Sequence, residues 1–228
     1  MTAPLLAQVE IRDRSEGTCV SDNGFCPDWI ADNLDRYVDP FLQHVVLTVV
    51  AVAIGFAIAF TLALVSYRRR WLIGPVTEVT AILYTIPSLA AFFLLLPITG
   101  RGFVTATIAL VSYSLLIIFR NVLAGLDNVP AEARDAGRGM GLTQRQLLWK
   151  VELPHAMPAI MAGLTQCIML SLSMVVIAAL VGAGGLGRPV VRALNQVNIA
   201  MGFEAGLAIV ILAIVLDRVC KQPQRRAR

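Results

Sequence analysis

The sequence predicts an all-α protein, a bundle of about five helices that cross a membrane, and its composition is the first reason. Of its 228 residues, 57% are hydrophobic and only 15% are charged, with a mean hydropathy of +0.72. Soluble domains are roughly 45–50% apolar and about 25% charged. A chain of 24.6 kDa cannot hide this much apolar surface from water. The composition therefore excludes a soluble enzyme, a disordered chain and a disulfide-rich mini-protein.

Long stretches without charge are the second reason. A bilayer core about 30 Å thick needs roughly 20 apolar helical residues, because the backbone finds no water there and must bond to itself. The fourth stretch is longer than one span, and splitting it would give a sixth. The fifth is short and reaches membrane length only with Glu204 or Asp217 near an interface. The expected spans are residues 45–67, 79–100, 102–119, 156–187 and 205–216.

The placement of Lys and Arg predicts the orientation. Cytoplasmic loops of membrane proteins carry an excess of these residues. With five spans and the N-terminus outside, 13 of the 19 basic residues fall inside, so we expect N-out and C-in. The net charge of +4 is interpreted as orientation and partner docking, and not as affinity for nucleic acid. The inner set is Arg68, Arg69, Arg70, Arg120, Arg134, Arg138, Arg145, Lys150, Arg218, Lys221, Arg225, Arg226 and Arg228.

Three regions are expected along the chain. Residues 1–40 are polar and are predicted to form an exposed N-terminal segment. Residues 41–220 form the transmembrane domain, and residues 221–228 form a cytoplasmic tail. Cys19 and Cys26 lie in the exposed segment, as a small disulfide or as two free thiols.

The loop between the third and fourth spans, residues 127–158, is the most informative segment. Pro130 suits the first turn of a helix, which continues over residues 131–136. Three glycines, at 137, 139 and 141, are expected to break that helix. The Thr-x-x-Gln pattern at 143–146 is a capping box that starts a second helix, and Pro154 is expected to end it. The loop is thus predicted to be two short helices joined at a glycine corner.

This loop resembles the EAA loop of ABC importer permeases. That family pattern is Glu-Ala-Ala, three residues, Gly, nine residues, then Ile-x-Leu-Pro. The sequence reads Asp-Ala-Gly at 135–137, Gly141, and Val-Glu-Leu-Pro at 151–154, with the same spacing and three conservative departures. The resemblance covers roughly residues 40–219. Residues 84–89 are similar to the second span of osmoprotectant permeases, and residues 171–178 and 184–187 to the glycine betaine/proline branch.

The resemblance implies a division of labour. The fold would be that of a type I ABC importer permease, in the cytoplasmic (inner) membrane of a prokaryote. A second permease chain completes the pathway in the bilayer, as a homodimer or a heterodimer. Separate ATPase subunits bind ATP and Mg, so that this chain binds no cofactor or metal and has no catalytic residues. A solute-binding protein delivers a compatible solute outside: glycine betaine, choline, carnitine or proline.

The resemblance also implies which residues contact the ATPase. In the family, the EAA loop carries a coupling helix that sits in a groove of the ATPase. Arg134, Arg138 and Arg145 either add ion pairs to that contact or only hold the loop inside. The expected coupling residues are Glu132, Ala133, Asp135, Ala136, Gly137, Gly141, Leu142, Leu153 and Pro154.

Residues of the translocation pathway are harder to predict. Pro87 interrupts the second span and predicts a kink, which shapes a gate or serves only packing. A betaine-type cation favours aromatic faces, yet no aromatic cluster stands out, and high-affinity recognition is assigned to the binding protein. Ser173 is a candidate for hydrogen bonding between helices. The pathway candidates are Tyr84, Pro87, Ser88, Phe92, Tyr113 and Ser173.

Other functions fit the sequence less well. Residues 182–187 match Gly-x-Gly-x-x-Gly, but a membrane span precedes them and they face outside, so a helix-ending turn is favoured over a nucleotide site. The main alternative is an ATP-independent channel or secondary carrier. The sequence has no inverted halves, repeated ion-coupling charge or filter motif for it. An intramembrane enzyme is disfavoured because hydrolase and metalloprotease motifs are missing.

Overall fold

The computed structural model describes residues 27, 35–196 and 198–226, and within them every regular element is a helix. Most of the predicted N-terminal segment, with Cys19 and Cys26, lies outside the described residues. Four helices are long and apolar enough to cross a membrane, and one bent helix pair makes a fifth span. The predicted count of about five is therefore confirmed within the part of the chain described.

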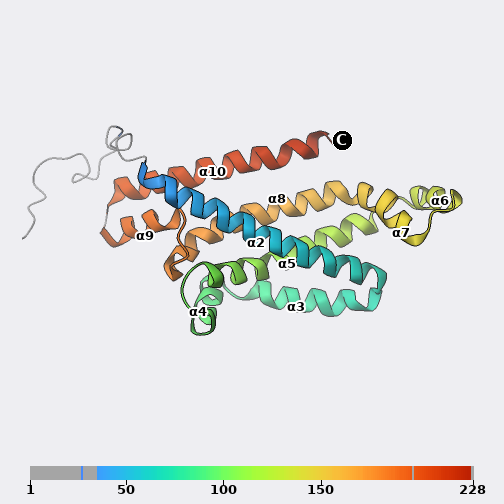
Figure 1. Ribbon diagram of the computed structural model, residues 1–228, viewed down its shortest axis with the longest axis horizontal. Helices are drawn as coiled ribbons and strands as arrows, with labels where there is room; N and C mark the ends of the chain where they lie inside the picture. Colours follow the sequence, from blue (N-terminus) through green and yellow to red (C-terminus); the bar gives the residue numbers. More distant parts are fainter. Residues whose placement is uncertain (1–26, 28–34, 197, 227–228) are drawn as a thin grey trace, which may run out of the picture.

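The long helices run side by side along the longest axis of the molecule (Figure 1). They are α2 (Asp35–Arg68), α5 (Phe103–Asp127), α8 (Leu153–Ala178) and α10 (Ile199–Arg226). Helices α6 (Ala131–Gly139) and α7 (Gln144–Leu147) protrude at one end, called here the loop end. Helix α9 (Gly187–Gln196) lies at the other, called the opposite end.

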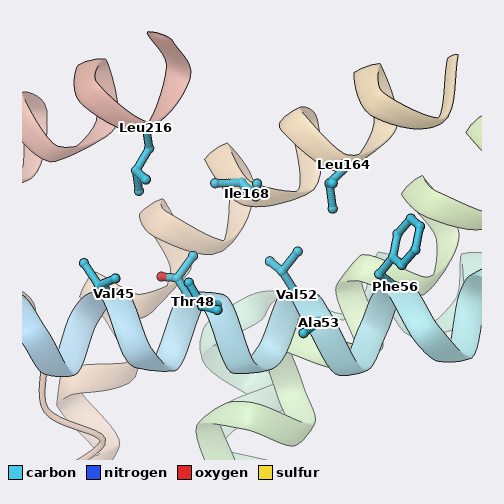
Figure 2. Close-up of a pocket in the computed structure, with 9 residues that line it drawn as sticks. Val45, Thr48, Val52, Ala53, Phe56, Leu164, Ile168 and Leu216 are labelled. Atoms are coloured by element: carbon cyan, nitrogen blue, oxygen red, sulfur yellow. The ribbon is translucent and has the colours of Figure 1, made fainter. Parts of the chain in front are cut away.

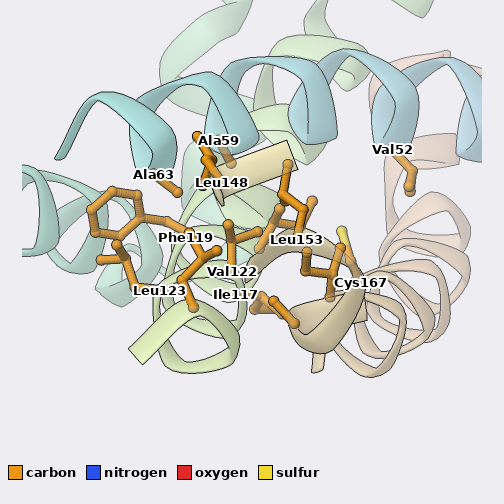
Figure 3. Packing of buried hydrophobic residues seen from close by; sticks show 14 residues of the cluster. Val52, Ala59, Ala63, Ile117, Phe119, Val122, Leu123, Leu148, Leu153 and Cys167 are labelled. Atoms are coloured by element: carbon orange, nitrogen blue, oxygen red, sulfur yellow. The ribbon is translucent and has the colours of Figure 1, made fainter. Parts of the chain in front are cut away.

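The core forms where α2, α5 and α8 meet (Figure 3). Small residues recur every four positions on the buried face of α2, at Ala51, Gly55, Ala59 and Ala63. This spacing puts them on one face and lets α5 approach closely, as small residues do in membrane helices. A Cβ atom added to Gly55 would lie 1.8 Å from Ser114 Oγ of α5. The small side chains on this face of α2 thus allow the backbones of α2 and α5 to pack closely.

The second span differs from the prediction of one helix over 79–100. After a short turn, Arg70–Leu72, the chain forms α3 (Ile73–Thr85) and then α4 (Ser88–Thr99), bent from α3 by 95°. The break falls at Pro87, which has no backbone N–H to continue α3. The predicted kink is therefore confirmed at Pro87, and its angle of 95° is larger than that of a kink that only serves packing.

The fourth apolar stretch also ends sooner than predicted. Helix α8 stops at Ala178, a short turn (Ala179–Val181) follows, and three glycines with positive φ lead into α9. Residues 156–187 carry no charge, so hydropathy gave no sign of this boundary. The stretch is therefore one span and a turn, which removes the need for a sixth span.

The two ends of the bundle separate the basic residues as the orientation prediction requires. Arg68 and Arg145 lie at the loop end, towards which α10 also runs. Arg188 and Arg192 lie on α9, at the opposite end. The loop end therefore corresponds to the predicted inside.

Candidate functional site: a protruding loop and a broken helix

Helix α6 begins after Pro130 as predicted but runs further than expected, to Gly139. Gly137 and Gly139 therefore lie inside the helix, and the prediction that they break it is wrong. Gly141 ends the helix, with φ +77°, a conformation that glycine adopts without strain. The Leu142 N–H donates to the Gly137 carbonyl (3.2 Å), and the Gly141 N–H donates to the Arg138 carbonyl (2.9 Å). These two bonds form a Schellman motif that satisfies the last carbonyls of α6.

The second helix begins with the predicted capping box. The Thr143 hydroxyl accepts the Gln146 N–H (3.4 Å), and the Gln146 side chain accepts the Thr143 N–H (2.9 Å). Pro154 does not end this helix, contrary to the prediction. The backbone widens into a π-turn over Leu148–Glu152 and continues directly into α8. Because a proline ring collides with the carbonyl four residues earlier in a regular helix, the wider turn accommodates Pro154.

One face of α6 packs on the loop and the other is open to solvent. Gly137 is buried, and a Cβ atom there would lie 2.6 Å from the Leu147 methyl group. Glu132, Asp135 and Ala136 are exposed. They are three and four residues apart, so they share the outward face. The outward face of α6 is thus acidic and small.

The remaining predicted loop residues divide between packing and surface. Ala133 and Leu142 are half-buried, and Leu153 is buried in the core between α2, α5 and α8. Pro154 is exposed, like Gly141. The sequence interpretation missed Met140, a residue that is 73% exposed at the tip of the loop. A large apolar residue between two glycines was the available signal, because such a residue has no core to join.

The charges of the loop end are organised around Glu152. The Arg134 Nε donates to Glu152 Oε1 (3.1 Å), and the Tyr67 hydroxyl of α2 donates to the same oxygen (3.1 Å). Arg134 is therefore engaged within the chain, and of the three arginines considered for the ATPase contact it is the least available. Arg138 pairs with Asp135 on the surface (3.6 Å). A polar cavity of about 360 Å³ lies beside Glu152, lined by Tyr67, Arg68, Gln144, Arg145, Leu148 and Glu152.

Several predicted pathway residues meet at the break between α3 and α4. The hydroxyl of Tyr113 on α5 donates to the carbonyl of Ile86, at the junction of the two helices. The rings of Tyr84 and Tyr113 meet edge to face, with centroids 5.8 Å apart. Pro87 precedes Ser88, the first residue of α4. The broken helix is thus held by a hydrogen bond from a neighbouring span.

The other pathway candidates lie differently. Phe92 is fully buried and packs in the same cluster as Tyr113, so it supports the break from within. Ser173 is exposed on α8, and its hydroxyl donates to the Met169 carbonyl of its own helix (3.3 Å). The structure does not place Ser173 in a hydrogen bond between helices.

A second cavity, of about 310 Å³, lies between α2, α8 and α10 (Figure 2). Its lining is apolar. The one hydroxyl among the lining residues, that of Thr48, already donates to the His44 carbonyl of its own helix (2.8 Å). Phe56 is its one aromatic residue. A charged ligand therefore finds no partner group here. The lining residues are Val45, Thr48, Val49, Val52, Ala53, Phe56, Leu164, Ile168 and Leu216.

At the opposite end, the glycine-rich turn is fixed to α2. The Leu186 N–H donates to Nδ1 of His44 (3.2 Å), and the Gly185 N–H donates to the Gln43 side chain (3.3 Å). Nε2 of His44 lies 3.2 Å from the Leu172 carbonyl of α8. Residues 182–187 thus form the predicted helix-ending turn. Among the described residues, no group of three or more His, Cys, Asp or Glu is placed to hold a metal ion.

Glu204 lies at the same end and is buried in the bundle. Its Oε2 accepts a hydrogen bond from the Tyr37 hydroxyl (2.8 Å), which joins α10 to the first turns of α2. Asp217, the second acid expected near an interface, is half-buried much further along α10.

Comparison with known proteins shows which family has these features. Residues 51–227 match the model of the binding-protein-dependent transport system inner membrane component family. The osmoprotectant import permease protein OsmW of Salmonella typhimurium is 37% identical, over 83% of this chain and 90% of the relative. The glycine betaine/carnitine/choline transport system permease protein OpuCD of Bacillus subtilis is 34% identical, over 84% of each.

Other similarities cover less of the relative or concern the fold. The glycine betaine/proline betaine permease protein ProW of Escherichia coli is 39% identical over 78% of this chain, which spans 49% of ProW. A chain of the inward-facing methionine ABC transporter MetNI superposes with a TM-score of 0.77 at 22% identity, over 89% of this chain and 100% of the other. That likeness shows the type I importer permease fold.

The family decides between the functions weighed from the sequence. Its members are permease components of ATP-driven importers, which disfavours an ATP-independent channel or carrier and an intramembrane enzyme. The family name and the helices long enough to span a bilayer both place the chain in the inner membrane, with several crossings. The chain belongs to the binding-protein-dependent transport system inner membrane component family and is a permease subunit of an ABC importer.

Proposed function

We propose that this permease forms half of a pathway that imports a compatible solute: glycine betaine, choline, carnitine or proline. The relatives support this solute class, because their names include glycine betaine, carnitine and choline. A second permease chain, identical or related, completes the pathway. Solute arrives from an extracytoplasmic binding protein at the opposite end. ATP and Mg act on separate ATPase subunits at the loop end.

The observation that carries this proposal is the outward face of α6. This helix stands at the tip of the bundle, with Glu132, Asp135 and Ala136 exposed and with Met140 beside them. Methionine is enriched at protein–protein interfaces, and Met140 lies exposed at the protruding tip of the loop. We assign this face to a groove of the ATPase, with Met140 as the apolar anchor. The packed residues Gly137, Leu142 and Leu153 hold the face in place.

The broken helix supports the pathway part of the proposal. Transporters commonly build solute sites where a spanning helix is interrupted. Tyr84 is partly exposed beside Tyr113, and aromatic faces attract quaternary ammonium ions. Tyr113 is buried, so Tyr84 alone offers an exposed ring here, and the partner chain would have to supply further contacts. One exposed ring suits a weak, transient contact along a pathway.

The experiment uses the permease with its ATPase and binding protein in proteoliposomes. We expect ATP-dependent uptake of one of the four labelled solutes. Asp135→Lys reverses a charge on the outward face of α6, and we expect it to reduce ATPase co-purification and uptake about tenfold or more, in line with loss of a docking contact. Asp39→Lys reverses an exposed acid in the first turns of α2, at the opposite end, and should leave ATPase co-purification unchanged.

Three results would each contradict one part of the proposal. Uptake that continues without any ATPase would contradict the ATP-driven part. Full co-purification and uptake with Asp135→Lys would show that the outward face of α6 does not dock the ATPase. A complex that transports another solute class, and none of these four, would contradict the solute assignment alone.

A further inference from the structure

Three polar side chains far apart in sequence meet at the loop end, and we call them the loop-end cluster: Tyr67, Arg134 and Glu152. Tyr67 lies in the last turn of α2, Arg134 on α6 and Glu152 on the π-turn before α8. Arg134 donates to Glu152 Oε1 (3.1 Å) and to the Tyr67 hydroxyl (3.2 Å). Tyr67 donates in turn to Glu152 Oε1 (3.1 Å). Each member therefore bonds to both others.

Two further contacts extend the cluster to α5. The second terminal nitrogen of Arg134 (Nη2) also donates to the Leu126 carbonyl (2.6 Å), in the last turn of α5, where carbonyls have no partner within the helix. Arg70 stacks over the Tyr67 ring, 4.7 Å from its centroid, and forms an ion pair with Asp127 (2.8 Å). A single side chain of α6 thus binds the inner ends of three membrane helices.

Burial makes this contact different from the surface pair on the same helix. The side chains of Arg134 and Glu152 are 23% and 9% exposed, whereas those of Arg138 and Asp135 are 58% and 73% exposed. Exposed pairs contribute little because water and salt screen them. A charge-assisted network shielded from water is stronger and holds a defined geometry. The cluster is therefore the firm polar attachment of α6 to the bundle.

We infer that the loop-end cluster is a positioning device which makes α6 move together with the inner ends of α2, α5 and α8. This inference rests on the proposed function, in which the ATPase moves α6. Helix α6 is only nine residues long, and the chain leaves it through a short connection on one side and a glycine turn on the other. Without the cluster, α6 would be joined to the bundle mainly through these two connections and its packing on α7 and the π-turn. With it, the displacement reaches three spans at once.

The test compares uptake and ATP hydrolysis in the same proteoliposomes. Arg134→Met alone leaves Glu152 buried without its counter-ion, which impairs folding. The double variant Arg134→Met/Glu152→Gln removes both charges and so relieves that structural defect. We expect the double variant to assemble and to hydrolyse ATP, while solute imported per ATP falls roughly 2- to 30-fold, the range of coupling changes that single positions produce. Tyr67→Phe should lower the same ratio less, because it removes one hydroxyl and no charge.

The ratio of solute to ATP separates positioning from a purely structural role. Lys150→Met removes an exposed cation from the same π-turn and should leave the ratio at the wild-type value. A wild-type ratio in both the double variant and Tyr67→Phe would overturn the inference, while wild-type uptake would still support the proposed function. If the wild-type complex itself shows no ATP-driven uptake, the proposed function fails and the inference fails with it.

Discussion

The two ends of the bundle are built by different chemistry. At the loop end, a protruding helix is held by charged side chains, with Arg134 bonded to Glu152, Tyr67 and the Leu126 carbonyl. At the opposite end, a glycine turn is held by neutral groups: the Gly185 and Leu186 N–H groups donate to the side chains of Gln43 and His44. A protruding helix has little apolar surface to bury, so directional polar bonds must fix it. A turn lying on the bundle can pack its backbone directly on helices.

This comparison predicts that a methyl group added at the opposite end has the largest effect. Gly187 begins α9, and a Cβ atom there would lie 2.2 Å from the Val176 carbonyl oxygen. Because backbone cannot rotate away, we expect Gly187→Ala to cost about 1–3 kcal/mol or more. The measurement is thermal unfolding in detergent. Gly74→Ala is the control, since its added Cβ meets nothing within 4 Å; equal melting of the two variants would refute the packing account.

An intermediate effect is expected at the capping box of the loop end. Thr143→Ala removes the hydroxyl that accepts the Gln146 N–H, which typically costs about 1 kcal/mol at a helix N-terminus. Helix α7 should then fray, seen as faster hydrogen exchange at the Gln146 amide. Thr143→Ser keeps the hydroxyl and should keep the protection. Equal exchange in wild type and Thr143→Ala would show that the cap is not needed.

The smallest effect is expected from a methyl group at the loop end itself. A Cβ atom on Gly137 would lie 2.6 Å from a methyl group of Leu147, a flexible side chain that can turn aside. Alanine also stabilises a helix interior by about 0.5–1 kcal/mol relative to glycine. We therefore expect Gly137→Ala to unfold at or slightly above the wild-type temperature, with uptake retained. A loss as large as that of Gly187→Ala would remove the contrast between the two ends.

Local patterns predicted much of the fold. The number of membrane spans, the capping box at Thr143 and the break at Pro87 depend on neighbouring residues alone, and all three are confirmed. Hydropathy did not locate the end of α8, because residues 156–187 carry no charge, whereas the glycines at 182–187 did predict the turn that follows it. The prediction that Pro154 ends a helix is wrong because a π-turn accommodates this proline, and no sequence pattern predicted that turn.

The site was predicted less completely, because some residues that meet there lie far apart in the sequence. The coupling residues share one short motif, so their spacing could be recognised. The partners of Arg134, by contrast, are Tyr67 and Glu152, which lie 67 and 18 residues away from it. Only the packing of α2, α5 and α8 brings them together. Met140 was missed because one exposed apolar residue makes no periodic pattern.

The central claim is that the ATPase binds the loop end of the bundle and the binding protein binds the opposite end. Crosslinking from each end tests this claim most directly. Ala136→Cys places a thiol on the outward face of α6, and Leu194→Cys places one on α9, at a residue that is 73% exposed. A bifunctional maleimide is added to the assembled complex. We expect Ala136→Cys to crosslink to the ATPase alone and Leu194→Cys to the binding protein alone. Crosslinks with the two partners exchanged, or an active complex whose Ala136→Cys never joins the ATPase, would contradict the account.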